Sequence, residues 1–296
     1  MNSLKNKVPL IVVADIGGSH ISCGVYQVDG SLLIDGSITR ECIDSCGSAE
    51  SILASFVSTM SASAALVGTT VAALAIAMPG PFDYDNGISY IKGLNKYEAL
   101  YGYDLKQYFA SYFKIDADLV SFRNDAESII AGEVANSKSK IRNGILGLTL
   151  GTGFGSAVSY HGETKDVDFG AEPFLDGIAD EYFSTRWFIR RYWELSGINV
   201  NGVMGLIEEK NTKLVKEVFL EFSKNLVFFL QPKLKEPKIN ELILCGNIAK
   251  AHRYFLPYLA ESFKDVTITI GHLGEKAAMI GAAKNFQSSK FLDITP

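Results

Sequence analysis

The sequence is poor in the features that mark secreted, membrane-bound or metal-stabilised proteins. It has only four cysteines, Cys23, Cys42, Cys46 and Cys245, and they form no CxxC pair. Free, reduced thiols are the expected state, with a metal ion at Cys42 and Cys46 as the alternative. The sequence shows no targeting segment and no apolar run that reaches the length of a membrane span. We therefore expect a cytoplasmic protein with no membrane partner.

Basic charge is also scarce and dispersed. The chain has 28 Lys and Arg against 33 Asp and Glu, a formal net charge of −5, and the basic residues form no cluster. Neutralising the phosphates of a nucleic acid requires clustered Lys and Arg, so we expect no nucleic-acid partner. The remaining composition is that of a globular protein, and 296 residues are enough for two domains or one large one.

Glycines are concentrated at two places where apolar strands are predicted to turn. Gly17 and Gly18 lie between two β-branched runs, and Gly151, Gly153 and Gly155 repeat this arrangement half a chain later. A Rossmann dinucleotide site is disfavoured, because its glycines open a helix and these precede a strand. Such a turn can present backbone N–H groups to phosphate oxygens, or the glycines can merely permit a tight hairpin. Two turns of this kind predict a fold that is built twice.

The order of predicted strands and helices indicates an α/β protein with mixed sheets and helices on their faces. We place a domain break near residue 120, giving domains 1–120 and 121–296, with a C-terminal helix that returns to the first domain. Apolar periodicity and capping residues predict several helices: one after Ser48, one from Asp104, one over 212–230 that stops at Pro232, one near Ile248 and one over 275–286. Strands are predicted over 71–78 and 241–246.

Asn124 and Asp125 lie where a predicted strand, residues 118–122, leads into a predicted helix. Asn124 and Glu127 have the spacing of a capping box, so one interpretation is that the pair only caps the helix and complements its dipole. The other interpretation takes account of the two glycine turns. Near bound phosphate, Asp125 could accept the proton of an attacking hydroxyl. With both turns present we favour the second.

Asp15 ends a strand that is otherwise apolar, where an unpaired carboxylate is costly. It either caps the turn through the amides of Gly17 and Gly18 or faces a hydrated magnesium ion, which prefers oxygen ligands and keeps several waters. The glycine turns favour magnesium.

Two further features of the sequence are compatible with nucleotide binding. Thr152 adds a hydroxyl that a terminal phosphate could use. Gly246 and Asn247, between a strand and a helix, are either a purine-binding turn or a left-handed turn with an N-cap.

Together these segments resemble the ROK family of sugar kinases and repressors, over nearly the whole chain. The resemblance implies an α/β, two-domain actin/hexokinase (ribonuclease-H-like) fold with a central cleft that closes on sugar and ATP. It also implies magnesium as a cofactor and a homodimer as a common assembly. The segments that carry it occur in the family's order: DIGGSHISCGVYQVDG, Pro79-Gly80-Pro81, RNDAESIIAGE, LTLGTGFGSAV, LILCGNIA and LGEKAAMIGAA.

The resemblance also implies roles for individual residues. Asp125 would be the catalytic base, Asn124 would hold a sugar hydroxyl, and Asp15 would face magnesium through water. The family often has two glycines at the adenosine turn, so Asn247 is a small departure. The residues that match the family's ATP-binding positions are Asp15, Gly17 and Gly18 in the first phosphate loop, Gly151, Thr152 and Gly153 in the second, and Gly246 and Asn247 at the adenosine turn.

A larger departure lies in residues 169–187. Glu172 matches the glutamate of the family's Glu-x-Gly-His motif, but Leu175 stands where the histidine would be, and the zinc cysteines that usually follow are absent. We therefore expect no structural zinc. Asp180 stands in place of a sugar-binding glutamate. Glu172 and Asp180 are the expected sugar ligands, and we expect both to lie away from the two glycine turns.

Three functions compete on this evidence. The favoured one is an ATP-dependent kinase, a phosphotransferase acting on a hydroxyl of a hexose or N-acetylhexosamine. A sugar-sensing repressor would need a helix-turn-helix domain ahead of Asp15, for which we expect no room, and the acidic charge agrees. A degenerate sugar-binding protein is the remaining alternative. It is disfavoured because Asp125 does nothing for binding that an Asn could not do.

Overall fold

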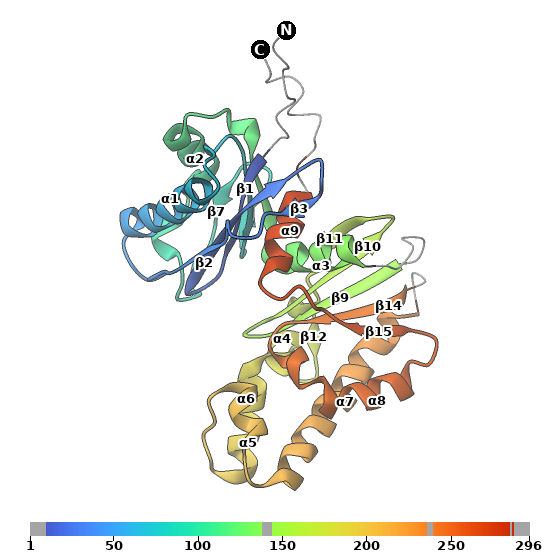
Figure 1. Cartoon of the computed structure of the whole chain (residues 1–296). Helices are drawn as coiled ribbons and strands as arrows, with labels where there is room; N and C mark the ends of the chain where they lie inside the picture. The colour runs from blue at the N-terminus through green and yellow to red at the C-terminus, as the bar shows by residue number, and fades with distance from the viewer. Residues whose placement is uncertain (1–9, 138–143, 236–238, 285, 287–296) are drawn as a thin grey trace. The chain divides into compact units, whose positions relative to one another are not determined.

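The computed structural model describes residues 10–137, 144–235, 239–284 and 286, and the chain forms two compact units (Figure 1). Unit 1 is Met1–Gly132 with Glu275–Pro296, and unit 2 is Glu133–Gly274. The boundary between the units lies after Gly132, so the Val120–Asn124 strand belongs to unit 1. The break predicted from the sequence was near residue 120.

Unit 1 contains a six-stranded mixed sheet in the order β3-β2-β1-β5-β8, with β4 also paired to β2. The hairpin β1–β2 is antiparallel, and β1, β5 and β8 are parallel to one another. Beside this sheet is a two-stranded ladder, β6–β7. The strands are β1 (Leu10–Ile16), β2 (His20–Gln27), β3 (Leu32–Leu33), β4 (Thr39–Cys42), β5 (Leu74–Met78), β6 (Phe82–Asp83), β7 (Ile88–Ser89) and β8 (Val120–Asn124).

Helices cover both faces of the unit 1 sheet (Figure 1). Because side chains alternate along β1, Val12 and Ala14 pack with α1 and α2, whereas Ile11 and Val13 pack with α9 on the other face. The helices are α1 (Ala49–Leu66), α2 (Leu105–Phe113), α3 (Asp125–Asn136) and α9 (Lys276–Lys284), with short 3₁₀ turns η1 (Glu98–Leu100) and η2 (Ala117–Leu119).

Unit 2 repeats this topology, with a five-stranded sheet in the order β11-β10-β9-β14-β15. Here too an antiparallel hairpin, β9–β10, is followed by two parallel strands, so the prediction of a fold built twice is confirmed. The strands are β9 (Gly144–Leu150), β10 (Phe154–Tyr160), β11 (Glu163–Asp166), β14 (Ile239–Cys245) and β15 (Thr267–Ile270), with a separate ladder of β12 (Pro173–Phe174) and β13 (Gly177–Ile178).

An aromatic core joins the helices of unit 2 to one face of its sheet. Phe183, Phe222 and Phe229 are buried and in ring contact with one another or with Phe154 of β10. The helices are α4 (Ala179–Phe183), α5 (Thr185–Ser196), α6 (Gly202–Ile207), α7 (Thr212–Lys233) and α8 (Leu256–Ser262), with η3 (Phe169–Ala171) and η4 (Ile248–Tyr254).

Several predicted boundaries differ from the structure. Helix α7 continues to Lys233 and contains Pro232, because a proline in the last turn removes only one hydrogen bond. Strand β5 begins at Leu74, and the helix expected near Ile248 is the 3₁₀ turn η4 followed by α8. Helix α9 spans Lys276–Lys284, and residue 285 of the predicted 275–286 helix lies outside the described residues.

Among the described residues one helix, α1, is long and apolar enough by composition to cross a membrane, contrary to the expectation that no run reaches that length. Its buried side chains, such as Phe56 and Met60, belong to the core of unit 1. That packing is what a core helix requires, and it accounts for the apolar composition.

Candidate functional site

The parallel strands of unit 1 bring Asp15 and Asp125 to the same edge of the sheet. Asp15 of β1 is in register with Ala77 of β5, which is in register with Arg123 of β8. Asp125 follows two residues later as the first residue of α3. The carboxyl ends of adjacent parallel strands are where α/β proteins place ligand-binding residues.

Burial disfavours the charged forms of both carboxyls. Burial raises the pKa of Asp15 to about 7, and the negative charges of Asp125 and Glu275 act in the same direction, against Arg40. Burial also raises the pKa of Asp125, while the Ala126 amide, 2.8 Å from Asp125 Oδ1, and the charge of Lys96 oppose it. Two carboxylates that repel each other offer the hard oxygen ligands that a divalent cation prefers, so these residues fit magnesium.

The raised pKa of Asp15 predicts a pH-dependent stability. An unfolded Asp loses its proton near pH 3.8, whereas folded Asp15 keeps it to about pH 7. Between these values the folded state binds more protons, so the contribution of Asp15 to the free energy of unfolding falls as pH rises from 4 to 7. We expect Asp15→Asn to be more stable than the wild type at pH 8, by on the order of 2 kcal/mol, and to lose this advantage toward pH 4.

Urea denaturation of the wild type and Asp15→Asn across this pH range, with EDTA present, checks the prediction. Asp29→Asn, an exposed aspartate in the turn after β2, is the control and should show no such trend. A stability difference for Asp15→Asn that does not change with pH would contradict it.

Asn124 caps helix α3, and its side-chain amide is hydrogen-bonded to Tyr84, which in turn contacts the end of β5. Its Oδ1 accepts a hydrogen bond from the Glu127 amide at 3.0 Å, which confirms the predicted N-cap. Its Nδ2 donates to the Tyr84 hydroxyl at 3.1 Å, and that hydroxyl donates to the Met78 carbonyl at 3.1 Å. The sugar-binding role of Asn124 remains a prediction. The sequence contained no signal for Tyr84, because the contact joins residues 40 apart.

Neither glycine turn needs glycine for its own backbone conformation. Gly17, Gly18, Gly151 and Gly153 all lack a positive φ, so the alternative of a tight hairpin with positive φ does not hold. A Cβ on Gly18 would meet only a lysine side chain at 4.0 Å, and one on Gly151 only a carbonyl at 4.0 Å. The space above Gly18 and Gly151 is therefore open, as close approach of a ligand to the backbone requires.

The second turn presents unused hydrogen-bonding groups. The Gly151 amide donates to the Gly153 carbonyl at 3.0 Å, and the Gly151 carbonyl accepts from both the amide and the hydroxyl of Thr185. Thr152 is exposed, and within the described part of the chain its hydroxyl and amide have no hydrogen-bond partner. Amides and a hydroxyl in this arrangement suit phosphate oxygens, so the turn fits the phosphate chain of ATP.

The structure corrects the expectation that Asp180 lies away from the glycine turns. Asp180 Oδ1 accepts the Phe154 amide at 2.7 Å and lies 3.2 Å from the position of a Cβ on Gly153. Its other oxygen pairs with Arg186. Helix α4 starts one residue before Asp180 and places it there, a contact across 26 residues that local patterns do not encode.

Glu172 lies at the end of η3 and forms an ion pair with Lys233 of α7. The Lys233 ammonium also lies over the rings of Phe169 and Phe229, at 4.2 and 4.4 Å from their centroids. Leu175, at the position of the family histidine, is 64% exposed and has a positive φ of 52°. The structure thus gives Glu172 a cationic neighbour and leaves Leu175 outside the core.

At the predicted adenosine turn, glycine is required by both conformation and space. Gly246 has a φ of +91°, and a Cβ there would lie 2.4 Å from the Leu150 carbonyl oxygen. Asn247 is exposed, and its side chain makes no cap bond to η4. The left-handed conformation of Gly246 is confirmed, but Asn247 is not an N-cap through its side chain. The purine-binding alternative stays a prediction, and the side-chain amide of Asn247 is available to a ligand.

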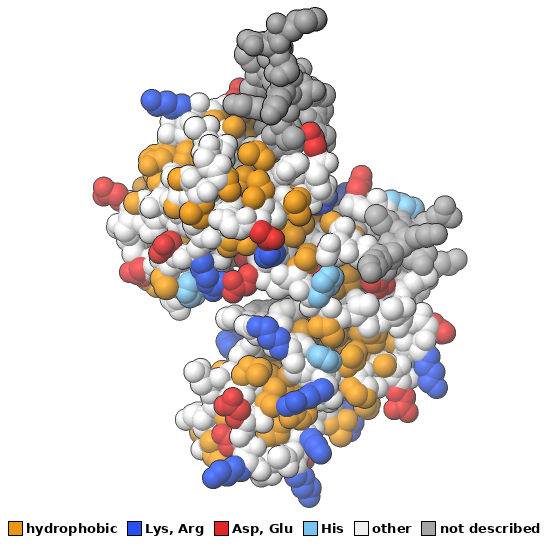
Figure 2. All heavy atoms as spheres, in the orientation of Figure 1, with side chains coloured by type: hydrophobic (Ala, Val, Ile, Leu, Met, Phe, Trp, Pro, Cys, Tyr) orange, Lys and Arg blue, Asp and Glu red, His pale blue; other side chains and the backbone are white. Residues whose placement is uncertain are grey.

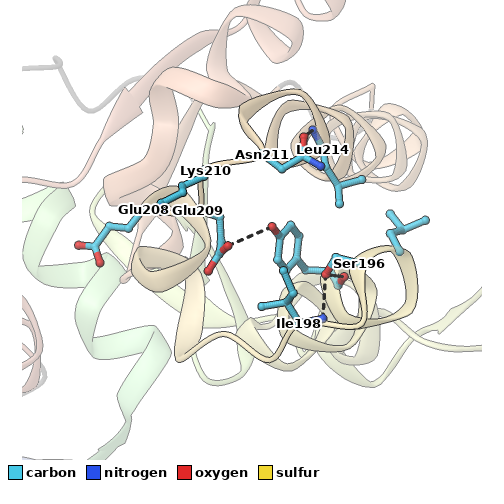
Figure 3. A pocket seen from close by; sticks show the side chains of 9 residues that line it. Ser196, Ile198, Glu208, Glu209, Lys210, Asn211 and Leu214 are labelled. Carbon is cyan, nitrogen blue, oxygen red and sulfur yellow. Dashed lines mark hydrogen bonds between the residues drawn. The ribbon is translucent and has the colours of Figure 1, made fainter.

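Other features of the described residues do not form a second site of this kind. No group of three His, Cys, Asp or Glu side chains there could hold a metal ion, and the four cysteines are free thiols. Acidic and basic side chains are interspersed on the face shown in Figure 2. A pocket of about 620 Å³ in unit 2 is lined by residues of α5 and α7 and by the connection before α7, which includes Glu209 and Lys210 (Figure 3). None of its lining residues is a predicted site residue.

The duplicated sheets, each with a hairpin followed by parallel strands, define a two-domain fold of the actin/hexokinase type. Within that class, the chain belongs to the ROK family, whose model matches residues 11–171. A comparison with curated proteins finds no match.

Solved structures agree with this fold at low sequence identity. A ROK family glucokinase from Streptomyces griseus, in complex with glucose and AMPPNP, has a TM-score of 0.74 at 18% identity, covering 94% of this chain and 99% of its own. A glucokinase from Parabacteroides distasonis has a TM-score of 0.75 at 20% identity, with 97% and 100% covered. A ROK family transcriptional regulator, a homologue of the E. coli MLC protein, has a TM-score of 0.76 at 13% identity, with 94% and 78% covered.

Proposed function

We propose that this ROK protein is an ATP-dependent sugar kinase that phosphorylates a hydroxyl of a hexose or N-acetylhexosamine. The observation that carries the proposal is the pair of carboxyls at one edge of the unit 1 sheet, with Asp125 at the N-terminus of α3 and Asp15 next to an open glycine turn. Phosphoryl transfer uses a base that accepts the proton of the acceptor hydroxyl and a ligand for magnesium. Asp125 would be the base, and Asp15 would be the magnesium ligand.

In unit 1 the Gly18 amide would bind a phosphate oxygen. In unit 2 the Thr152 amide would bind phosphate and Asn247 would contact adenosine. Asp15 would hold hydrated magnesium, which when bound would neutralise part of the charge of the phosphoryl group that ATP supplies. Asp125 accepts the proton of the sugar hydroxyl as that oxygen attacks. Its raised pKa makes it a better proton acceptor than an exposed aspartate once it is ionised.

The alternative is a sugar-binding or sugar-sensing protein without catalysis. The exposed Leu175 at the position of the family histidine favours this alternative, and a regulator shares the fold. Asp125 supports the kinase, because binding alone does not require an ionisable group at the start of α3. We further propose a cytoplasmic protein that needs no structural zinc and forms a homodimer.

A coupled assay of ADP release distinguishes the two. We expect ADP release that depends on a sugar and on magnesium in a screen of glucose, mannose, fructose, N-acetylglucosamine and N-acetylmannosamine. Binding of a sugar, measured by calorimetry, with no ADP release for any of them would support the sensing alternative.

Substitutions at Glu172 and Asp180 are both expected to raise the KM for sugar, but only those at Asp180 should also raise the KM for ATP. A charge-assisted hydrogen bond from a sugar hydroxyl to Glu172 would be lost in Glu172→Gln, raising the KM for sugar about ten- to a hundredfold and the KM for ATP little. Asp180→Ala should raise the KM for ATP as well, because it removes the acceptor that holds the Phe154 amide beside the second glycine turn. Glu163→Gln, on exposed β11 of the same unit, is the control. Equal effects of Glu172→Gln on both substrates would contradict this assignment.

A further inference from the structure

Lys96 lies beside the first glycine turn, and its charge acts on Asp125. The Cδ atom of Lys96 is 4.0 Å from the position that a Cβ on Gly18 would occupy. The charge of Lys96 also lowers the pKa of Asp125, so its ammonium acts on that carboxylate. The side chain is half-buried, and within the described residues it makes no hydrogen bond or ion pair.

The backbone around Lys96 is strained and anchored to the glycine turn itself. Its neighbours Asn95 and Tyr97 both have a left-handed conformation, with φ of 52° and 54°. The Tyr97 hydroxyl donates to the Gly17 carbonyl, and the Tyr97 amide donates to the Ser45 carbonyl at 2.6 Å. Strain of this kind persists only where surrounding contacts maintain it, and it is concentrated at ligand sites. Tyr97 therefore fixes the position of Lys96 relative to the turn.

The carboxylates around the first glycine turn would repel a phosphate group, so phosphate binding there needs a positive charge. Besides burial, the charges of Asp125 and Glu275 raise the pKa of Asp15, and these carboxylates would repel a phosphate group at Gly18. Arg40 is paired with Glu275 at 2.6 Å. In the described part of this region, Lys96 is thus a cation that no carboxylate holds in an ion pair. Charge-assisted hydrogen bonds from such an ammonium to phosphate oxygens are strong.

We propose that Lys96 is a further catalytic residue, whose ammonium binds the terminal phosphoryl group at Gly18 and stabilises its charge during transfer. The proposal rests on the proposed kinase function. In the transfer, the bond from the terminal phosphorus to the β–γ bridging oxygen breaks and leaves ADP. A bond to the sugar oxygen forms, and the proton of that hydroxyl passes to Asp125. Lys96 forms no covalent bond and stays protonated throughout.

Calorimetric binding of AMPPNP and ADP tests this role without catalysis. We expect Lys96→Gln to weaken AMPPNP binding about tenfold or more and to leave ADP binding within about twofold, because only AMPPNP carries the terminal group. Lys96→Arg keeps the charge and should retain part of the affinity. Lys92→Gln is the matched control, since Lys92 is exposed on the same segment and its ammonium lies over the Tyr101 ring. If a sugar is phosphorylated, kcat of Lys96→Gln should fall about a hundredfold.

Two results would overturn the role of Lys96: AMPPNP binding by Lys96→Gln equal to that of the wild type, or an equal loss for AMPPNP and ADP. Melting temperatures within a few degrees of the wild type show that the variants fold. Failure of the kinase function has a different signature. A wild-type protein that binds AMPPNP more tightly than Lys96→Gln does, yet phosphorylates no sugar, contradicts the proposed function and supports the phosphate contact.

Discussion

Asp125→Asn is expected to lower kcat by about a hundredfold or more while leaving sugar affinity nearly unchanged. Asparagine keeps the shape of the side chain and its acceptor for the Ala126 amide, but it cannot take the proton of the sugar hydroxyl. The raised pKa of Asp125 also predicts that the wild-type rate falls as pH drops through the pKa, because the protonated form cannot act as base. Steady-state kinetics at several pH values measure both effects.

Asp85→Asn serves as control, since Asp85 is exposed in the turn between β6 and β7 and should keep wild-type kinetics. Near-normal turnover of Asp125→Asn would show that another group accepts the proton. A large rise in the KM for sugar with kcat retained would assign Asp125 to binding.

Gly281→Val is expected to destabilise unit 1 by about 3 kcal/mol or more. Helices α3 and α9 meet at Gly281, where an added Cβ would lie 1.7 Å from the Ser128 carbonyl oxygen, and at Gly132, where it would lie 2.1 Å from that of Ala277. Both obstacles are backbone atoms, so a side chain can fit only if the helices move apart. Because α3 begins with Asp125, such a shift should also reduce activity.

Urea denaturation of Gly281→Val and Gly205→Ala compares a tight helical glycine with an open one. Gly205 lies in α6, where an added Cβ would meet atoms only at 4.0 Å, so alanine there should be neutral or stabilising by up to about 1 kcal/mol. Wild-type stability of Gly281→Val would mean that α3 and α9 do not pack this closely.

The parts of the fold that local physics determines could be predicted from the sequence. Apolar runs on either side of the glycines predicted the two hairpins, and the N-cap Ser48 with its following periodicity predicted α1. The junction at Asn124 was likewise predictable, because a polar cap directly after an apolar strand marks the start of a helix. Asp15 and Asp125 then lie at the same edge of the sheet because β1, β5 and β8 are parallel.

The parts that depend on contacts between distant segments could not be predicted. Asp180 reaches the Phe154 amide across 26 residues, and Tyr97 reaches Gly17 across 80, so neither contact leaves a periodic pattern in the sequence. Lys96 was overlooked for the same reason. A single lysine in an irregular segment has no signature until Tyr97 and the glycine turn fix its position.

Transfer of the terminal phosphoryl group of ATP to a sugar can be observed directly. The protein is incubated with magnesium, a sugar from the screen and ATP labelled at the terminal phosphate, and the products are identified by mass spectrometry. We expect labelled sugar phosphate in equal amount to ADP with the wild type, and little of either with Asp125→Asn. Sugar and ATP that both bind but yield no sugar phosphate, for any sugar in the screen, would contradict the proposed kinase function.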